Sequence, residues 1–519
     1  MRALNCLILI SLLSAASSPA AEPAATLEFH ARSRQPVPNA TNQFEVVEKT
    51  LRWDAKKTAI IICDMWDQHW CKGATARVAE MAPRMNRVVK EARGRGVFVI
   101  HAPSDTMKFY ADWPQRKRAE QAPKATPPRD VGQWQSLNRA KEPPLPIDDS
   151  DGGCDDSPQC PGGAPWKRQI ASIEIAPEDA ISDKGDEVYN LLQQYGRDNL
   201  IVMGVHENMC VLGRPFSIRQ MVSLGKNVLL MRDMTDTMYN SRRRPYVSHF
   251  VGTDLVAEHI EKFWCPTVTS ADILGGQPFH FKEDHRSRIV FIIGEPEYHT
   301  WETLPAFAQT ELATRGFICE FVNAPPLEGN EFTNWQKIAE ADLLFVSARR
   351  RTPELPMLEA IRHHLEAGKP LVGIRTASHS FAAKPPDAEH GAWDHFDRDV
   401  LGAQYEGHYA NQLGPRLRLA GEAAGDPILI GLPADGFQSP HSLYRSRNLA
   451  PTTKVLLTGS IAVEGREVTE PVAWINTNAH RRVFYTSLGG PEDFKNPVFR
   501  RLLLNGVLWS LQQPIPPPD

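Results

Sequence analysis

The sequence DNLIVMGVHENMCVLGRPFSIRQMVSLGKN, residues 198–227, decides how the first half of the chain is organised. Its apolar run from Leu200 to Val205 is typical of a strand buried on both faces. A short turn follows, then Cys210, then a helical pattern that Gly225 can end. Because a helix N-terminus offers unpaired N–H groups and a favourable dipole, we expect it to stabilise a Cys210 thiolate and to hold an oxyanion.

The alternative is that Cys210 is a small buried hydrophobic residue, as many cysteines in apolar surroundings are. Two further residues favour a catalytic role. Asp64 ends the strand pattern TAIIICD, and Lys184 directly precedes the helix pattern GDEVYNLLQQYG, whose apolar residues recur at helical spacing. An acid, a lysine and a cysteine that each stand at the edge of a βα unit can converge at one end of a parallel sheet.

Three segments, IIICDMWDQHW, ISDKGDEVYNLLQQYG and NLIVMGVHENMCVLG, resemble the landmark blocks of the isochorismatase-like cysteine hydrolases, which include nicotinamidases. The resemblance implies a triad of Asp64, Lys184 and Cys210. Cys210 would attack a carbonyl or imine carbon, Asp64 would take the thiol proton, and Lys184 would keep Asp64 ionised. The family usually has a non-proline cis peptide just before the cysteine, here within residues 205–207. The oxyanion turn would then comprise His206, Glu207 and Cys210.

Nicotinamidases also carry an Asp-x-His-type metal site near the triad. In this chain the residues at suitable places are Asp67, His69 and His101. Asp67 and His69 have the required spacing, but they follow the first strand, whereas the motif of the family follows the second. Two or three such ligands can form an open site, so a divalent metal on these residues and a chain without a metal cofactor both stay open as alternatives.

The strand pattern TAIIICD, the helix pattern ARVAEMAPRMNRVVKEARGRG and the strand pattern VFVIHAP alternate, which predicts a parallel sheet with helices on both faces. Residues 104–168 break this alternation and are rich in Pro, Asp, Gly and Trp. Long segments without periodicity in a compact domain are usually functional or disordered. We interpret this one as a lid or substrate-selecting insertion; the alternative is a surface decoration.

The second half of the chain resembles ThuA-like domains, which are relatives of the class I glutamine amidotransferase fold and are associated with trehalose utilisation. The segments that carry the resemblance are IIGEPEYHTW, GIRTASHSF, LGAQYEGHY and the closing block VAWINTNAHRRVFYTSLGGPEDFKNPVFRRLLLNGVLWSL. The amidotransferases place a nucleophilic cysteine on the turn after the central strand. Here that turn, residues 374–379, contains no cysteine, so we do not expect amidotransferase chemistry.

A polar pocket is predicted in this second domain, and a sugar or sugar-derived ligand for it rests on family analogy alone. The candidate lining residues are His299, Arg375, His379, His408 and His480. The alternative is that these histidines are dispersed over the surface or cap helices.

The chain has 519 residues, which is too long for one core, and its 42% hydrophobic and 23% charged shares are those of a globular protein. The net charge of −4 offers no electrostatic case for nucleic acid. The predicted class is α/β, with two three-layer α/β/α domains, each built on a mostly parallel sheet. The predicted boundaries are a signal peptide at 1–21, a hydrolase domain at 45–265, a linker at 266–286 and a ThuA-like domain at 287–515.

Residues 1–21 combine an early arginine with the apolar run LNCLILISLLSAA, a pattern typical of a secretory signal peptide. We therefore expect export, to the periplasm or beyond, and no membrane span after cleavage. In an oxidising compartment Cys154 and Cys160 could close a short disulfide. Two free thiols are the alternative. A zinc site is less favoured, because no second Cys/His pair stands nearby in the sequence.

Together these patterns predict an exported cysteine hydrolase that cleaves a small amide or related C–N bond through a covalent Cys210 intermediate. The second domain would bind or process a sugar-related ligand. Ether hydrolysis stays open, because isochorismatase cleaves a vinyl ether without needing the cysteine. One alternative is a carbohydrate-binding or scaffold protein of an exported degradation system with a residual triad; another makes the second domain the catalytic one. The expected partners are a small-molecule substrate, a carbohydrate at the second domain and, in a homo-oligomer, further copies of the chain.

Overall fold

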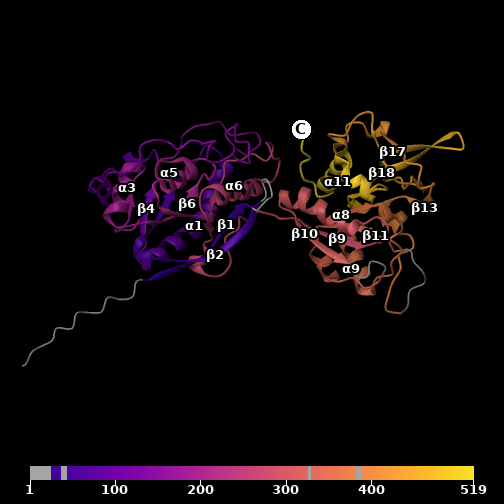
Figure 1. Cartoon of the computed structure of the whole chain (residues 1–519), viewed down its shortest axis with the longest axis horizontal. Helices are drawn as coiled ribbons and strands as arrows, with labels where there is room; N and C mark the ends of the chain where they lie inside the picture. Colours follow the sequence, from indigo (N-terminus) through magenta and orange to yellow (C-terminus); the bar gives the residue numbers. More distant parts are fainter. Residues whose placement is uncertain (1–24, 37–43, 325–328, 382–387, 519) are drawn as a thin grey trace, which may run out of the picture. The chain divides into compact units, whose positions relative to one another are not determined.

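A computed structural model describes residues 25–36, 44–324, 329–381 and 388–518 of the chain. Two compact units are present (Figure 1). The first comprises the described residues within 25–146, 152–238 and 255–281, and the second comprises those within 147–151, 239–254 and 282–518. The predicted signal peptide, residues 1–21, lies outside the described residues. Among the helices of the described residues, none combines the length and the apolar character that crossing a bilayer requires.

In the described part of the first unit, eight strands form one sheet in the order β2-β1-β8-β7-β6-β3-β4-β5. The strands from β8 to β5 pair in parallel, and β1 and β2 form an antiparallel hairpin at one edge. Every residue of β3 and β6 is buried, as expected for apolar strands covered on both faces. The bounds are β1 Thr26–Pro36, β2 Phe44–Asp54, β3 Thr58–Cys63, β4 Phe98–Ala102, β5 Ala180–Ile181, β6 Asn199–Val205, β7 Asn227–Asp236 and β8 Thr267–Val268.

Helices connect these strands and cover the sheet. The longest is α1, whose apolar face packs on β3, β6 and β7 through Met81, Met85 and Val88. Full burial of such a side chain contributes about 1.5–3 kcal/mol, so this one face anchors the helix to the sheet. The helices up to residue 274 are α1 Lys72–Gly94, α2 Pro114–Glu120, α3 Gly185–Gln194, α4 Cys210–Gly213, α5 Ile218–Ser223, α6 His249–Phe263 and α7 Ala271–Leu274.

The helix predicted after Cys210 is broken into two short pieces. α4 ends at Gly213, Arg214 takes an extended conformation (φ −61°, ψ 150°), and α5 begins at Ile218. Pro215 explains the break, because a proline disfavours the helical conformation of the residue before it and has no N–H to donate. The break takes Arg214 out of the helix, which matters for the site described below.

Part of the segment that was expected to be a linker, residues 266–286, belongs to the first sheet. β8 pairs with β7, and β1 pairs with β8, so the sheet extends beyond residue 265. The hairpin of β1 and β2 likewise adds residues before the predicted start at 45.

In the described part of the second unit, nine strands form a mixed sheet in the order β10-β9-β11-β12-β19-β18-β17-β14-β15. Pairing is parallel from β10 to β19 and antiparallel from β19 to β15. β13 and β16 form a separate pair. The bounds are β9 Arg288–Gly294, β10 Ile318–Asn323, β11 Leu343–Ala348, β12 Leu371–Ile374, β13 Gln404–His408, β14 Arg416–Leu419, β15 Phe437–Gln438, β16 Tyr444–Arg447, β17 Thr453–Val463, β18 Arg466–Asn476 and β19 Val483–Thr486.

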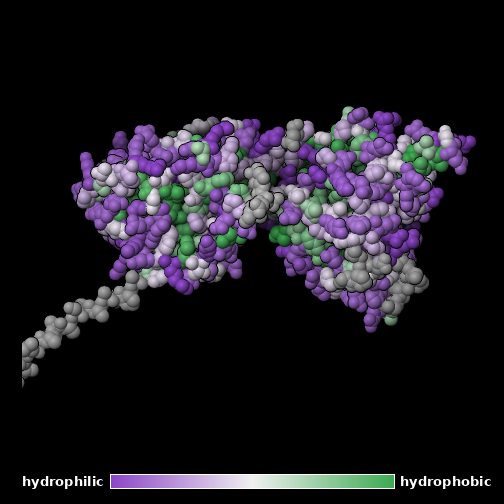
Figure 2. All heavy atoms as spheres, in the orientation of Figure 1, coloured by the Kyte–Doolittle hydropathy of each residue, from purple (hydrophilic) through white to green (hydrophobic). Residues whose placement is uncertain are grey.

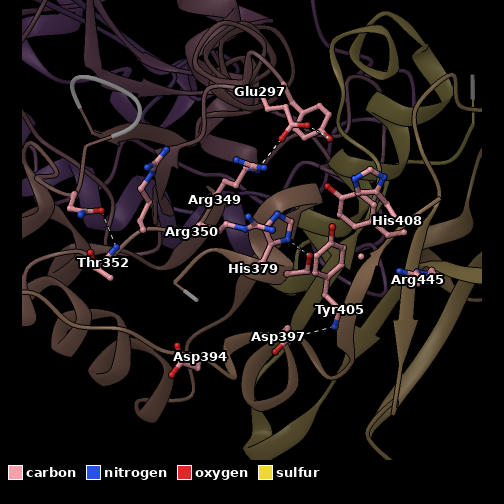
Figure 3. Close-up of a pocket in the computed structure, with 16 residues that line it drawn as sticks. Glu297, Arg349, Arg350, Thr352, His379, Asp394, Asp397, Tyr405, His408 and Arg445 are labelled. Carbon is pink, nitrogen blue, oxygen red and sulfur yellow. Dashed lines mark hydrogen bonds and ion pairs between the residues drawn. The ribbon is translucent and has the colours of Figure 1, made fainter. Parts of the chain in front are cut away.

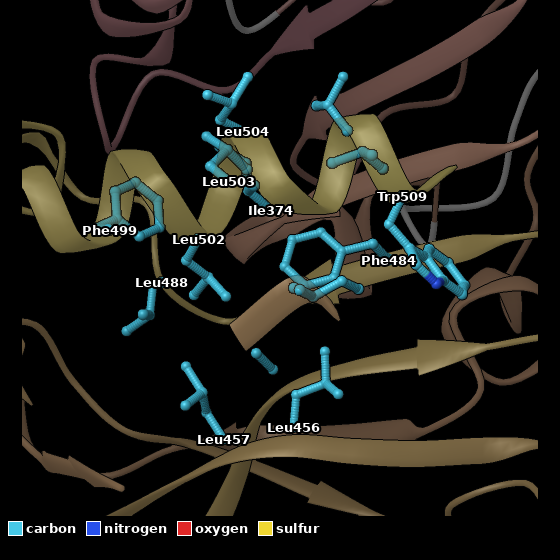
Figure 4. Packing of buried hydrophobic residues seen from close by; sticks show 14 of the residues in the cluster. Ile374, Leu456, Leu457, Phe484, Leu488, Phe499, Leu502, Leu503, Leu504 and Trp509 are labelled. Carbon is cyan, nitrogen blue, oxygen red and sulfur yellow. The ribbon is translucent and has the colours of Figure 1, made fainter. Parts of the chain in front are cut away.

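Figure 4 shows how α11 (Pro497–Ser510) packs on this sheet through Phe499, Leu502 and Leu503. The helix lies close to β19 at Gly506: a Cβ atom added there would lie 2.3 Å from the ring of Phe484, so the position has no room for a larger side chain. The other helices of the second unit are α8 Thr300–Phe307, α9 Leu355–Glu366 and α10 Pro491–Lys495, with a 3-10 helix, η6, at Arg375–His379.

The predicted class is confirmed: both units are α/β, with largely parallel sheets flanked by helices. The mixed outer half of the second sheet is the feature that strand periodicity did not predict. On the face seen in Figure 2, hydrophilic residues predominate over each unit, and apolar residues gather in smaller patches.

Candidate functional site

Asp64 is a buried carboxylate at the carboxyl end of β3. It adopts a left-handed backbone conformation (φ 47°), which is uncommon for a residue other than glycine, and its side chain is not exposed. Its Oδ1 accepts a hydrogen bond from the backbone N–H of Ser104 at 2.7 Å, and its Oδ2 accepts one from Nε of Arg214 at 3.1 Å. Both oxygens are therefore held in fixed directions.

Cys210, the first residue of α4, is 9% exposed and its thiol lies within hydrogen-bonding reach of both Asp64 and Arg214. Burial raises the pKa of the Cys210 thiol, the negative charge of Asp64 raises it further, and Arg214 opposes both effects. Burial also raises the pKa of Asp64, against the lowering effects of Arg214, Cys210 and Ser104. Burial therefore favours the neutral thiol of Cys210 and disfavours the ionised form of Asp64.

This differs from the thiolate that the helix N-terminus led us to expect. α4 is only one turn long, so its dipole is weak, while removal from water penalises the charged sulfur strongly.

Lys184, the predicted cation of the triad, lies elsewhere. Its side chain is 58% exposed, and its Nζ is 3.2 Å from Oε1 of Glu187, one turn along α3. The cation against Asp64 is Arg214. The structure therefore brings Asp64 and Cys210 together and supplies an arginine, not the lysine, as their positive partner. A sequence signal for this was present: Pro215 directly follows Arg214 and predicts that Arg214 leaves the helix.

The turn before Cys210 has the geometry that the resemblance implied. The peptide bond between Val205 and His206 is cis, and His206 and Glu207 are buried. The N–H of Glu207 donates to the carbonyl of Asp236 at 2.8 Å. The N–H groups of Met209 and Val211 donate to the carbonyl of His206 at 3.0 and 3.1 Å. Of the predicted oxyanion residues, Glu207 therefore has its backbone N–H engaged within the fold.

The three predicted metal ligands have separate partners. His101 is buried, with Nδ1 at 2.9 Å from Gln169 and Nε2 at 3.0 Å from Asp179. Asp67 accepts backbone N–H groups from residues 167 and 168. His69 packs among aromatic rings. Across the part of the chain that the structure describes, one group of metal-binding side chains has its ligand atoms within 4.8 Å of one another, and it is a different one: Cys71, Cys154 and Asp156.

Cys154 and Cys160, the predicted disulfide pair, are free thiols in the structure. Their Sγ atoms lie 3.5 and 3.2 Å from the same oxygen, Oδ2 of Asp156. The nearby Cys71, distant in the sequence, is 3.3 Å from that oxygen as well.

The insertion, residues 104–168, lies against the Asp64 site. Trp166 stacks on Trp66 with ring centroids 4.4 Å apart, and Nε1 of Trp66 donates to the carbonyl of Ser104. The guanidinium of Arg214 lies 5.6 Å from the ring of Trp134, also in the insertion. These contacts make the insertion part of the surroundings of Asp64.

The second unit holds a cavity of about 1050 Å³ (Figure 3). His379 and His408 line it, as predicted, together with arginines, acidic residues and tyrosines that the sequence did not single out. His299 lines a separate hollow beside α8 and α10, and His480 is an exposed residue in a 3-10 helix. The cavity lining comprises Glu297, Tyr298, Asn330, Arg349, Arg350, Arg351, Thr352, Ser378, His379, Asp394, Asp397, Tyr405, Gly407, His408, Tyr444 and Arg445.

Arg375 lies behind this cavity, on the turn after β12 where amidotransferases carry their cysteine. It is 2% exposed and left-handed (φ 42°). Its guanidinium lies 4.1 Å from the ring of Tyr298 and 4.8 Å from that of Tyr444, and it donates to the carbonyl of Ser487 and the hydroxyl of Ser442. A buried cation so surrounded fixes two aromatic walls of the cavity.

His379 is the buried histidine of the cavity. Its ring stacks on Tyr405 with centroids 4.4 Å apart (Figure 3), and its Nδ1 is 3.1 Å from the Ser378 hydroxyl. Burial, together with Arg350 and Arg349, lowers the pKa of His379 to about 3. The imidazole is therefore neutral at physiological pH and can accept a hydrogen bond or a proton.

Comparison with known proteins agrees with the ThuA-like resemblance of the second half. Residues 288–510 match the ThuA family model, described as trehalose utilisation. No curated protein matches the chain. Similar solved structures include a protein described as ThuA-like from Bacteroides uniformis (18% identity, 45% of this chain and 95% of that chain, TM-score 0.34). Another is a cysteine hydrolase from Pseudomonas syringae (18% identity, 43% of this chain and 92% of that chain, TM-score 0.28). A third is an isochorismatase family protein from Burkholderia thailandensis (13% identity, 42% of this chain and 94% of that chain, TM-score 0.25).

Proposed function

We propose that the first unit is a cysteine hydrolase that cleaves a small amide or a related C–N bond. The observation that carries the proposal is the buried carboxylate of Asp64, which is held by Ser104 and Arg214 and touches the thiol of Cys210. A nucleophile in contact with a base, and a base oriented by further groups, is the arrangement that covalent catalysis needs.

In the proposed reaction the Cys210 sulfur attacks the carbonyl carbon while its proton passes to Asp64. The electron pair of the carbonyl moves to oxygen, and the N–H of Cys210 donates to that oxyanion. The C–N bond then breaks, and the leaving amine takes the proton from Asp64. A water molecule attacks the resulting thioester with Asp64 again as base, the C–S bond breaks, and the carboxylic acid and the neutral thiol are released. Arg214 keeps Asp64 ionised in a site whose burial would otherwise favour the protonated acid.

We further propose that the cavity of the second unit binds a sugar-related ligand. Tyr298, Tyr405 and Tyr444 offer aromatic faces, and arginine, aspartate and glutamate side chains offer directed hydrogen bonds around them. A concave site with a few placed polar groups is typical of small-molecule binding. The trehalose-utilisation description of the matching family supports a carbohydrate. The turn at 374–379 lacks a cysteine, so covalent amidotransferase chemistry is not part of this proposal.

A second candidate function places catalysis in the second unit, where His379 lines the cavity with its Nδ1 3.1 Å from the Ser378 hydroxyl. The scaffold alternative, with a residual triad, needs neither site to react.

Export also stays a proposal. Expression of the full chain in a bacterial host, followed by mass analysis of periplasmic protein, should find an N-terminus near residue 22; recovery of the uncleaved chain from the cytoplasm alone would contradict export.

The test is a screen of small amides followed by intact-mass analysis of the protein after rapid acid quench. Turnover should be accompanied by an acyl adduct on the peptide that contains Cys210, and Cys210→Ala should abolish both. Cys265→Ala, which alters a buried cysteine elsewhere in the first unit, is the matched control. Amide turnover that survives in Cys210→Ala would move catalysis to the second unit, where His379→Asn should then remove it.

A further inference from the structure

Three cysteines of the first unit converge on one carboxylate oxygen. Oδ2 of Asp156 lies 3.3 Å from Sγ of Cys71, 3.5 Å from Sγ of Cys154 and 3.2 Å from Sγ of Cys160. The ligand atoms of Cys71, Cys154 and Asp156 all lie within 4.8 Å of one another, and both cysteines are buried. Cys160, at the rim, is the fourth group.

These distances fit a tetrahedral metal ion. With Zn–S bonds of about 2.3 Å and a Zn–O bond of about 2.0–2.2 Å, tetrahedral angles place sulfur and oxygen ligands about 3.5–3.7 Å apart. The three S···O distances lie at or slightly below that value. Binding the ion would need the Cys160 side chain to turn toward the other two thiols, because its Sγ is not among the ligand atoms that lie within 4.8 Å of one another. Three thiolates select a soft or borderline ion such as Zn²⁺ over Mg²⁺ or Ca²⁺.

The surroundings suit the negative charge that such a ligand set carries. The group lies at the N-terminus of α1, a helix of 23 residues. The N–H of Gly73 donates to Oδ2 of Asp156 at 3.1 Å, and the N–H of Ala74 donates to Sγ of Cys71 at 3.4 Å. Donors of this kind and the helix dipole stabilise anionic ligands and hold them in position.

We propose that Cys71, Cys154, Cys160 and Asp156 bind one Zn²⁺ ion as a structural site. Four protein ligands leave no open position for a substrate, so the ion supports the fold and takes no part in the reaction. It would join the start of α1 to the insertion, two segments more than 80 residues apart. The sequence argued against zinc because no second Cys/His pair stands near Cys154; the fold supplies Cys71 from a distance.

The site would also steady the candidate catalytic turn. Met238 belongs to one apolar cluster with Cys71 and Cys154, and Trp70 and Met209 pack against that cluster. Met209 directly precedes Cys210, so an ordered zinc site holds one side of the turn that presents the thiol. The zinc proposal stands on its own geometry and does not depend on the proposed hydrolase activity.

The experiment measures metal in the full, mature protein after expression with zinc and gel filtration. Elemental analysis should find one zinc per chain, and Co²⁺ exchanged into the site should show strong thiolate-to-cobalt charge-transfer absorption. Cys71→Ser and Asp156→Asn should each lower zinc affinity by at least the roughly 10- to 100-fold that loss of an outer-shell partner causes. Cys265→Ser, a buried cysteine outside the group, should retain the metal.

A second readout uses the unaltered protein, so it does not depend on whether a variant folds. Alkylation with and without a strong chelator, located by peptide mass, should label Cys71, Cys154 and Cys160 only after chelation. A metal-free protein in which two of these cysteines form a disulfide would overturn the proposal. So would zinc content that is unchanged in Cys71→Ser and Asp156→Asn.

Discussion

Nε of Arg214 donates a hydrogen bond to Oδ2 of Asp64 at 3.1 Å, although 150 residues separate the two in the sequence. Asp64 is fully buried, while the side chain of Arg214 keeps 21% exposure. The positive partner of the buried carboxylate thus comes from the same segment as the thiol, four residues after Cys210. Any mechanism that uses Asp64 as a base depends on this ion pair.

We expect Arg214→Gln to lower kcat/KM for the amide substrate by at least about 100-fold at neutral pH, because Asp64 then loses the charge that keeps it ionised. Arg214→Lys should lose less, since it keeps the charge but not the planar guanidinium. Lys184→Gln is the control: it removes an exposed ion pair worth about 0–1 kcal/mol and should leave turnover unchanged. Equal losses in Lys184→Gln and Arg214→Gln would restore the lysine to the triad.

The raised pKa of Asp64 also predicts how activity depends on pH. The base works only when ionised, so kcat/KM should fall as pH decreases through the pKa of Asp64, and this fall should begin above the ordinary carboxyl range. Arg214→Lys, which weakens the ion pair, should move the fall to higher pH. A pH profile whose acid limb does not respond to Arg214 would show that another group controls it.

The same shift has a consequence for stability. A carboxyl group with a raised folded-state pKa binds its proton more tightly when folded, so its stabilising effect is present below the unfolded pKa and is lost as pH rises through the folded pKa. Asp64→Asn, a neutral mimic, should therefore be inactive but at least as stable as the parent at neutral pH. The difference in unfolding free energy between Asp64→Asn and the parent should vanish in acid, where both side chains are neutral. Thermal unfolding at several pH values measures this; a large loss of stability at neutral pH would contradict it.

Trp166→Ala should lower activity, because Trp166 is the insertion residue at the start of a series of contacts that orients Asp64. Trp166 stacks on Trp66, Trp66 donates to the carbonyl of Ser104, and the N–H of Ser104 holds Asp64. An aromatic pair contributes about 0.5–1.5 kcal/mol, so kcat/KM should fall by roughly 2- to 12-fold. Trp113→Ala, in the same insertion but packed on Phe109 and Tyr110, is the control and should have little effect.

The second cavity can be tested with trehalose as the probe, by calorimetric titration of the full chain. Tyr405→Ala should weaken binding by at least about tenfold, because it removes a ring from the cavity wall and leaves His379 unstacked. His379, with a pKa of about 3, stays neutral, so affinity should not change between about pH 5 and 8, where an ordinary histidine gains its charge. Absence of trehalose binding would contradict this choice of sugar, and a strong pH dependence would contradict the neutral imidazole.

The periodicity of apolar residues in the sequence was sufficient to predict the central strands of the first sheet. The apolar runs at residues 58–63 and 199–205 predicted parallel strands buried on both faces, and the structure confirms them as β3 and β6. Since parallel strands end at the same sheet edge, the sequence also placed Asp64 and Cys210 at one edge. These inferences hold because burial repeats along a strand with a period that the sequence records directly.

Tertiary structure alone decided which side chains meet. Lys184 precedes a helix as predicted, yet its long, exposed side chain pairs with Glu187 on the first turn of α3, while Arg214 reaches Asp64. Cys71 meets Asp156 only because α1 begins beside the folded insertion. His379 and His408 share a cavity, whereas His299 and His480 do not. Such contacts depend on rotamers and on packing between segments far apart in the chain, and local sequence patterns carry no record of either.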